Sequence, residues 1–438
     1  MNSRVKSHRL NQVFLVEGGL PLRGEIETLG NKNAALPILA AALLTDEPVV
    51  LRRVPDIADV RTMMDLLRSA GVSVQRGKNG SWRLRAKTVK GGALDPELCR
   101  RIRASILLAG PLLAREGIVD MRRPGGCVIG RRRVDTHILG LCRLGAEVST
   151  GDGYLMTARS GLRGADIWLD EASVTATENV VMAATLARGT TRLYNAACEP
   201  HVQDLCGLLC KMGARIHGIG SNRLEIEGVD RLHGAEHEII ADHQEVGSLI
   251  AAIAVTGGEA LIRQAVPGHL PNILSAFETL GVRCVARGPD LFVPAGQKLE
   301  IIPEASGAMA RIAAQPWPHF PTDLLSVMIV LATQCRGAVL LHDKMFESRM
   351  FFADRINAMG ANISICDPHR VIVMGPTPLK RGQHASPDIR AGVALLIAAL
   401  CANGQSRIEH VEIIDRGYER FDERLNALGA RIQRIREK

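Results

Sequence analysis

Aromatic residues are scarce in this sequence: Phe, Trp and Tyr together make up 3% of its 438 residues. Many proteins that bind single-stranded nucleic acid stack bases on aromatic side chains, so this scarcity argues against that class of partner. With 46% hydrophobic and 23% charged residues, the composition is typical of a globular protein and not of a disordered one. The core must therefore be built mainly from Ala, Val, Ile and Leu.

Long apolar runs are also absent. The longest uncharged ones, Ala34 to Leu44 and Ala391 to Ala402, fall well short of the ~18 residues of a membrane span. The basic N-terminus, Met1 to Leu10, is not followed by the apolar stretch of a secretory signal peptide. We therefore expect a cytoplasmic protein without membrane contact.

The cysteines do not form a recognisable framework. Ten cysteines in a chain of this length are too dispersed for a disulfide scaffold, and most lie in apolar helical runs. Cys206 and Cys210 lie one helical turn apart, but no further Cys or His pair at ligand spacing accompanies them. We expect reduced thiols and no metal site.

The net charge is +8, which suits either an anionic small substrate or nucleic acid. On a nucleic-acid-binding protein the basic residues should form a stripe along an outer face. Here they recur at the ends of expected helices and strands, where they could line one cleft and bind a phosphorylated small substrate. These residues are Lys32, Arg103, Arg132, Arg349, Arg390 and Arg416.

A pattern of helix, glycine and strand recurs six times along the chain. The glycines lie 68 to 79 residues apart, each where a helix needs a C′ residue with positive φ. They are Gly71, Gly145, Gly213, Gly281, Gly360 and Gly429. A helix that is apolar nearly all round precedes each of them, which indicates burial on all sides. The pattern predicts an α/β protein of six βαβαββ repeats, arranged as two lobes of three.

An enlarged loop in the second repeat is the first candidate for chemistry. Residues 122–133 contain three glycines and five arginines around Cys127. Glycines allow close approach of the backbone to a ligand, and cationic surroundings lower the pKa of a thiol. This context favours a reactive thiol over a structural one.

Polar residues at the starts of the buried helices leave two interpretations open. Acidic residues there, such as Glu178, Glu245 and Asp323, could be first-turn caps, and Asp323 could equally be a general base. Arg390 opposes the helix dipole, so we expect it to have a bound anion or carboxylate as its partner. For Arg349 and Arg416, a solvated ion-pair face is the alternative to a substrate site.

Six motifs together resemble the UDP-N-acetylglucosamine 1-carboxyvinyltransferase family, over nearly the whole chain from about Val16. The motifs are Gly30-Asn-Lys32-Asn33, Arg103-Ala-Ser, Pro124-Gly-Gly-Cys127, Phe320-Pro-Thr-Asp323, Phe346-Glu-Ser-Arg349 and Asp415-Arg416-Gly-Tyr-Glu. The resemblance implies an inside-out α/β barrel of two lobes. Lobe I would span residues 32–240, with the Cys127 loop, and lobe II residues 1–31 and 241–438.

The resemblance also implies the reaction and the roles of residues. The 3′-hydroxyl of the sugar attacks C2 of phosphoenolpyruvate, C3 is protonated, and phosphate leaves. Cys127 would donate the proton, form a pyruvate adduct and be the target of fosfomycin, while Asp323 would take or orient the hydroxyl proton. Lys32, Arg132 and Arg416 would hold phosphoenolpyruvate, supported by Arg349 and Arg390. The sugar nucleotide would bind at Asn33, Arg103, Arg132, Arg133, Val134, Asp135, Thr136, Glu171, Ala172, Ser173, Val174, Asp323 and Met345. No metal or organic cofactor is implied.

Four positions depart from the family's common residues: Glu171 replaces Lys, Trp317 replaces His, Arg133 replaces Pro and His243 replaces Arg. Replacing Lys by Glu weakens the attraction to a diphosphate. The alternative function is therefore that of a paralogue that enolpyruvylates another nucleotide or sugar nucleotide.

Overall fold

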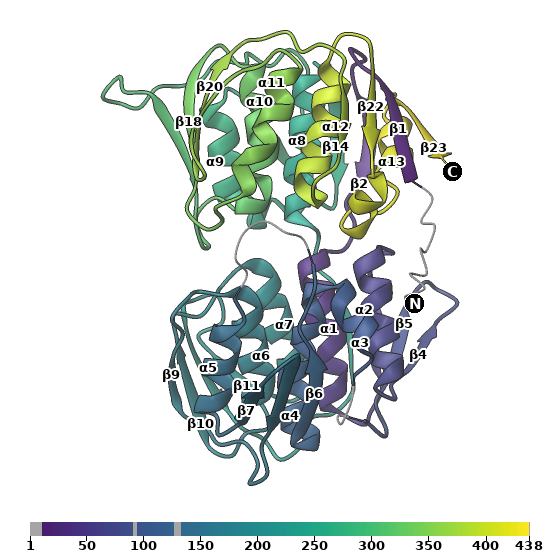
Figure 1. Ribbon diagram of the computed structural model, residues 1–438, viewed down its shortest axis with the longest axis vertical. Coiled ribbons are helices and arrows are strands. Elements are labelled where there is room, and N and C mark those ends of the chain that lie inside the picture. Colours follow the sequence, from purple (N-terminus) through teal and green to yellow (C-terminus); the bar gives the residue numbers. More distant parts are fainter. Residues whose placement is uncertain (1–10, 91–93, 127–132, 438) are drawn as a thin grey trace, which may run out of the picture. The chain divides into compact units, whose positions relative to one another are not determined.

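Figure 1 shows the computed structural model, which describes residues 11–90, 94–126 and 133–437. The chain forms two compact units. Unit 1 comprises the described parts of residues 1–28, 243–315 and 320–438, and unit 2 comprises those of residues 29–242 and 316–319. These units differ from the predicted lobe ranges at residues 29–31, 241–242 and 316–319.

Unit 2 contains three sheets, with strand orders β13-β3-β5-β4, β6-β8-β7 and β11-β12-β10-β9. Its elements, with η for 3-10 helices, are α1 (Lys32–Ala41), η1 (Ala42–Leu44), β3 (Val49–Arg52), α2 (Ala58–Ser69), β4 (Ser73–Arg76), β5 (Trp82–Arg85), α3 (Pro96–Arg101), η2 (Arg103–Leu108), α4 (Ala109–Glu116), β6 (Ile118–Arg122), α5 (Asp135–Arg143), β7 (Glu147–Thr150), β8 (Gly153–Thr157), β9 (Asp166–Trp168), α6 (Val174–Ala184), β10 (Thr190–Tyr194), α7 (Pro200–Lys211), β11 (Arg215–His217), β12 (Arg223–Glu227) and β13 (Ala235–Glu238).

Unit 1 also contains three sheets, with strand orders β21-β22-β1-β23, β15-β16-β14-β2 and β17-β18-β20-β19. Its elements are β1 (Asn11–Glu17), β2 (Arg23–Glu27), α8 (His243–Val255), β14 (Glu259–Arg263), η3 (Pro267–His269), α9 (Pro271–Thr279), β15 (Val285–Arg287), β16 (Asp290–Val293), β17 (Ala310–Ala314), η4 (Thr322–Leu324), α10 (Leu325–Thr333), β18 (Gly337–Asp343), η5 (Arg349–Phe352), α11 (Ala353–Ala358), β19 (Asn362–Asp367), β20 (Arg370–Gly375), β21 (Gln383–Ala385), α12 (Ile389–Cys401), β22 (Gln405–Glu409), η6 (Val411–Arg416), α13 (Phe421–Ala427) and β23 (Arg431–Glu437).

One repeat shows the pattern most clearly. In β9-α6-β10-α7-β11-β12, strand β10 runs parallel to β9 and antiparallel to β12, and β12 pairs with β11. A helix connects the parallel strands, as such a crossover requires. The unit 1 sheet of β17, β18, β20 and β19 has the same pairing pattern. The six predicted βαβαββ repeats, three in each unit, are confirmed, although the sheet of β6, β8 and β7 has three strands in the described part of the chain.

In two repeats, one strand is separated in sequence from the others, because the chain passes from one unit to the other between them. Strand β2 pairs in parallel with β14 in unit 1, whereas β13 pairs in parallel with β3 in unit 2. Between β2 and β13 the chain belongs to unit 2, which it enters after residue 28 and leaves after residue 242. Neither repeat is therefore continuous in sequence.

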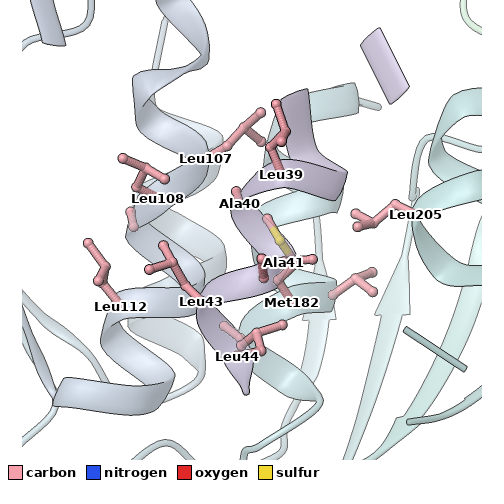
Figure 2. Close-up of a cluster of buried hydrophobic side chains, with 14 of the residues drawn as sticks. Leu39, Ala40, Ala41, Leu43, Leu44, Leu107, Leu108, Leu112, Met182 and Leu205 are labelled. Atoms are coloured by element: carbon pink, nitrogen blue, oxygen red, sulfur yellow. The ribbon is translucent and has the colours of Figure 1, made fainter. Parts of the chain in front are cut away.

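The apolar helices form the interior of each unit. In unit 1, α8, α10 and α12 pack against one another, and every residue of α10 is buried. In unit 2, α1 and α4 pack against α6. Figure 2 shows side chains from this interior, including Leu39 of α1, Leu112 of α4 and Met182 of α6. This arrangement of buried helices with flanking sheets is the predicted inside-out barrel.

All six repeat glycines have positive φ, between 79° and 101°. The glycine expectation is confirmed, because this left-handed region ends each helix and is costly for a residue with a Cβ. The helix expected from Ala104 begins instead as the 3-10 helix η2 and becomes α-helical at Ala109. No helix among the described residues is long and apolar enough to cross a membrane.

Candidate active site

Asp323 lies in η4 of unit 1, where two arginines bind its carboxylate. Nη2 of Arg349 donates to Oδ1 at 3.1 Å, and Nη2 of Arg390 donates to Oδ2 at 2.8 Å. The Asp323 side chain is 23% exposed, so it remains accessible while both oxygens are engaged. These contacts favour an oriented acid-base group over a simple helix cap.

Arg349 is almost fully buried, with 3% of its side chain exposed. Its Nε lies 3.4 Å from Oδ2 of Asp343, and its Nη1 has no hydrogen-bond partner among the described residues. A solvated ion-pair face is therefore wrong for Arg349. A buried guanidinium with an unsatisfied N–H can bind an anion at low desolvation cost, since the arginine is already out of water.

Asp343 holds the loop that follows β18. Its Oδ1 accepts hydrogen bonds from the amides of Met345 at 2.9 Å and Phe346 at 3.2 Å. Its Oδ2 accepts one from the Thr322 hydroxyl at 2.6 Å. Because Thr322 is adjacent to Asp323, Asp343 ties the Met345 loop to the Asp323 turn.

Arg390 has the carboxylate partner that its place in the first turn of α12 predicts. Besides Asp323, its guanidinium donates to the Tyr418 hydroxyl at 3.0 Å and to the side-chain oxygen of Gln244. Burial, followed by the nearby His269 and Arg390, lowers the pKa of His243 to about 3. His243 is therefore neutral near pH 7 and adds no positive charge to this cluster.

Arg416 is the last residue of η6 and is partly buried. Tyr418, two residues later, is 2% exposed and joins this segment to Arg390. Asp323, Arg349 and Arg390 are thus in direct contact, while Met345 and Arg416 are linked to them through neighbouring residues.

In unit 2, Lys32 and Asn33 begin α1. The side chain of Asn31 caps this helix by accepting from the amide of Ala34 at 2.9 Å. Nζ of Lys32 lies 2.8 Å from Oδ2 of Asp59 on α2, and only 11% of the lysine side chain is exposed. Lys32 is thus a buried cation held at a helix N-terminus, where an anion is also favoured.

Arg103, Arg133, Asp135 and Thr136 form a second cluster in unit 2. Nη2 of Arg103 donates to the carbonyl oxygen of Arg133 at 2.6 Å. The Arg133 side chain contacts Asp135 at 3.1 Å and Asp170 at 3.4 Å. The Thr136 hydroxyl donates to Asp170 at 2.7 Å, and the hydrogen bond with Asp135 is the main factor that raises the pKa of Arg133.

Residues 171–174 connect β9 to α6. Ser173 caps α6, accepting at 3.4 Å from the amide of Ala176, and Val174 is the first residue of the helix. Glu171 is exposed, and its charge contributes to raising the pKa of Arg133. Glu171 and Ala172 therefore lie in the turn beside the cluster around Arg133.

A buried His–Asn pair lies next to this turn, at the start of α6. His137 is 3.0 Å from the Thr175 hydroxyl and 2.8 Å from the side-chain nitrogen of Asn179. Burial, and then the charge of Arg103, lower the pKa of His137 to about 3. The neutral ring therefore fixes the starts of α5 and α6 relative to each other.

Cys127 and Arg132 lie outside the described residues. The described base of their loop packs closely on Arg103: Gly126 has φ +116°, and a Cβ there would be 2.9 Å from the Cβ of Arg103. A Cβ on Gly125 would be 1.7 Å from the carbonyl oxygen of Arg100. Only glycine fits at these two positions, so the residue before Cys127 is held beside Arg103.

Other site residues are absent from the sequence-based set. Asp59, Asp170, Asp343, Gln244 and Tyr418 hold predicted residues but were not predicted themselves. The sequence does point to Tyr418, since it lies within the motif that contains Arg416. Among the described residues, no group of three or more His, Cys, Asp or Glu side chains could hold a metal ion.

The interpretation of Glu178 as a first-turn cap is wrong. Glu178 lies inside α6, 1% exposed, and is not a solvated first-turn cap. Burial, and then the nearby Glu199, raise its pKa well above the ordinary value. Burial also raises the pKa of Glu199, although backbone amides of Glu199, Trp317 and Cys198 partly oppose this shift.

Solved structures resemble the whole chain. The enolpyruvyl transferase NikO from Streptomyces tendae has a TM-score of 0.86 at 23% identity, with 98% of this chain and 100% of that chain covered. EPSP synthase from Acinetobacter baumannii has a TM-score of 0.71 at 17% identity, with 97% and 100% covered. The fold is therefore that of the enolpyruvyl transferases.

Sequence relatives are more specific. The EPSP synthase (3-phosphoshikimate 1-carboxyvinyltransferase) family profile matches residues 16–425. UDP-N-acetylglucosamine 1-carboxyvinyltransferase from Bradyrhizobium diazoefficiens is 53% identical over 425 residues, 97% of this chain and 98% of that protein. The protein of the same name from Treponema denticola is 49% identical, with 97% and 99% covered. With its Asp323 and Lys32 clusters in the matched region, the chain belongs to the UDP-N-acetylglucosamine 1-carboxyvinyltransferase family of enolpyruvyl transferases.

Proposed function

We propose that this protein transfers the enolpyruvyl group of phosphoenolpyruvate to the 3′-hydroxyl of UDP-N-acetylglucosamine and releases inorganic phosphate. The hydroxyl oxygen bonds to C2 while C3 gains a proton, which gives a tetrahedral intermediate. Loss of phosphate from C2 and of a proton from C3 then restores the double bond. The observation that carries the proposal is the pairing of Asp323 with two buried arginines in a chain 53% identical to a relative of that name.

Asp323 is the group proposed to accept or orient the hydroxyl proton. Both of its oxygens accept hydrogen bonds from arginines, which fix the orientation of the carboxylate. Because the side chain is still 23% exposed, a bound hydroxyl can reach it. A base held in this way acts without reorientation during the reaction.

Phosphoenolpyruvate carries a phosphate and a carboxylate, so its site must supply several cations. We assign this role to Lys32, Arg132 and Arg416, with Arg349 and Arg390 supporting the anionic end. The unsatisfied Nη1 of buried Arg349 supports this assignment, because an anion would complete its hydrogen bonding. Arginines can hold such a dianion without giving up their protons.

The sugar nucleotide is assigned to Asn33, Arg103, residues 132–136 and 171–174, Asp323 and Met345, as the family resemblance implies. Arg103 and Arg133 supply donors for a diphosphate, and Asn33 lies in the first turn of α1. Exposed Glu171 adds a negative charge beside Arg133, where the family often has Lys. We expect this substitution to weaken diphosphate binding without changing the chemistry.

Cys127 is proposed as the proton donor to C3, and as the thiol that forms a pyruvate adduct and reacts with fosfomycin. In a cell, the reaction would open peptidoglycan precursor synthesis in the cytoplasm, with consequences for cell shape and division. No cofactor is required, because each proton transferred has a donor or acceptor among these side chains.

Phosphate release from phosphoenolpyruvate, measured with a panel of acceptors, tests the proposal. We expect release with UDP-N-acetylglucosamine and none with its 3′-deoxy analogue or with shikimate 3-phosphate. Mass spectrometry should find the enolpyruvyl ether of the sugar nucleotide. A clear preference for another nucleotide or sugar nucleotide would instead support the paralogue, which the names of the relatives do not favour.

A further inference from the structure

The hydroxyl of Tyr418 connects two of the buried helices of unit 1. It lies 2.8 Å from the Ser248 hydroxyl on α8 and accepts a hydrogen bond of 3.0 Å from Nη1 of Arg390 on α12. The Tyr418 ring packs against Phe421, with 4.9 Å between ring centroids, and the Arg390 guanidinium carbon lies 5.4 Å from the Tyr418 centroid. Tyr418 therefore contacts Arg390 through both its ring and its hydroxyl.

The direction of each hydrogen bond in this network can be assigned. The Ser248 hydroxyl lies 3.1 Å from the carbonyl oxygen of Gln244, to which it can only donate. Its single proton is then committed, so Ser248 accepts from Tyr418, and Tyr418 accepts from Arg390. The chain runs from Nη1 of Arg390 through Tyr418 and Ser248 to the Gln244 backbone.

The same network returns to Arg390 through the side chain of Gln244. Nη2 of Arg390 donates to Oε1 of Gln244 and, at 2.8 Å, to Oδ2 of Asp323. A guanidinium is planar, so fixing Nη1 on Tyr418 and Nη2 on Gln244 fixes the orientation of the whole group. Linked hydrogen bonds of this kind also strengthen one another in a buried setting.

We infer that Tyr418 is a positioning residue, whose hydroxyl holds Arg390 in the orientation that presents Asp323 and the anion-binding guanidinium to the substrates. The inference rests on the proposed function, because it assigns Arg390 to the phosphoenolpyruvate side of the site. Without the hydroxyl, an N–H of Arg390 and an acceptor of Ser248 lose their partner, although a phenylalanine ring would fill the same volume.

Tyr418→Phe tests the inference because it removes only the hydroxyl. We expect the KM for phosphoenolpyruvate to rise about tenfold and kcat to fall. The KM for UDP-N-acetylglucosamine should rise less, because Arg390 reaches that substrate only through Asp323. Tyr154→Phe, on β8 of unit 2, is the matched control and should leave both constants at the wild-type values. A merely structural role would lower the melting temperature and the active fraction without changing either KM, and that result would overturn the inference.

A double-mutant cycle with Arg390→Lys shows whether Tyr418 acts through Arg390. In the Arg390→Lys background, Tyr418→Phe should cost almost nothing more, because the planar group that it positions is gone. Additive losses would overturn the inference. If Tyr418→Phe does not fold, Ser248→Ala must raise the KM for phosphoenolpyruvate by itself, and an unchanged KM would be decisive against the network. Failure of the proposed function is distinct, since the wild-type protein would then release no phosphate.

Discussion

Lys32 and Asp59 form a buried ion pair: Nζ lies 2.8 Å from Oδ2, and only 11% and 8% of the two side chains are exposed. The pair joins the first residue of α1 to the first turn of α2. The lysine proposed to bind phosphoenolpyruvate therefore already has an anionic partner in the protein. A substrate phosphate must share Lys32 with Asp59 or displace it.

Asp59→Asn should destabilise the protein by about 3 kcal/mol, because it leaves the buried charge of Lys32 without its anion. Saturating phosphoenolpyruvate and UDP-N-acetylglucosamine should then raise the melting temperature more in the variant than in the wild type, because the ligand replaces the missing charge. Calorimetry with and without ligands measures both effects. Asp65→Asn is the control: it lies on the same helix in an exposed pair with Arg68 and should change stability by less than about 0.5 kcal/mol.

Asp323→Asn should lower kcat at least about 100-fold, because an amide cannot accept the hydroxyl proton. We expect a small change in melting temperature, since Asp323 is 23% exposed and Arg349 keeps its contact with the Asp343 carboxylate. The amide oxygen can also still accept from one arginine. Asp367→Asn, in a hairpin of unit 1, should keep full turnover. If Asp323 is only a helix cap, the variant will instead lose ~1 kcal/mol of stability and retain turnover.

Cys127 should react with fosfomycin faster than any other thiol. Burial raises the pKa of Cys99 to about 11 and those of Cys206, Cys335 and Cys401 to about 12, which leaves these thiols protonated. A time course of alkylation followed by peptide mass mapping identifies the labelled site. Preferential labelling elsewhere would contradict the assignment.

Exposed Cys366 and Cys142 are the other thiols that the reagent can reach in that experiment. Cys127→Asp is the sharper variant, because a carboxyl group can donate a proton but cannot form a thioether. It should retain turnover and resist the epoxide. Cys127→Ala should lose turnover, because alanine cannot donate a proton.

Glu178 should make the protein less stable as pH rises above about 4.5, its ordinary pKa. Because folding raises this pKa, the folded state retains a proton that the unfolded state loses. Each pKa unit of this difference costs about 1.4 kcal/mol at neutral pH. Glu178→Gln should therefore stabilise the protein more at pH 8 than at pH 5 in urea unfolding. Exposed Glu97→Gln is the control and should change stability only slightly, and by a similar amount at both pH values. An unchanged pH dependence in Glu178→Gln would show that Glu178 is ionised in the folded protein.

The features that the sequence alone determines are those that depend on neighbouring residues. The repeat glycines mark positions where the backbone must adopt positive φ, and the all-apolar runs mark helices with no face left for water. The anionic partner of Arg390 was also predictable, because a cation in the first turn of a helix needs compensation.

Only the tertiary structure decides which side chains complete the site. Tyr418 and Ser248 are 170 residues apart, and Asp59, Asp343 and Gln244 belong to helices or strands other than those of the residues they hold. The sequence likewise does not show that β2 pairs with β14 and β13 with β3, strands that lie far from them along the chain. Such contacts depend on how distant helices and strands pack. A carboxylate has the same local sequence signature whether it caps a helix, neutralises a buried lysine or is itself buried with a raised pKa.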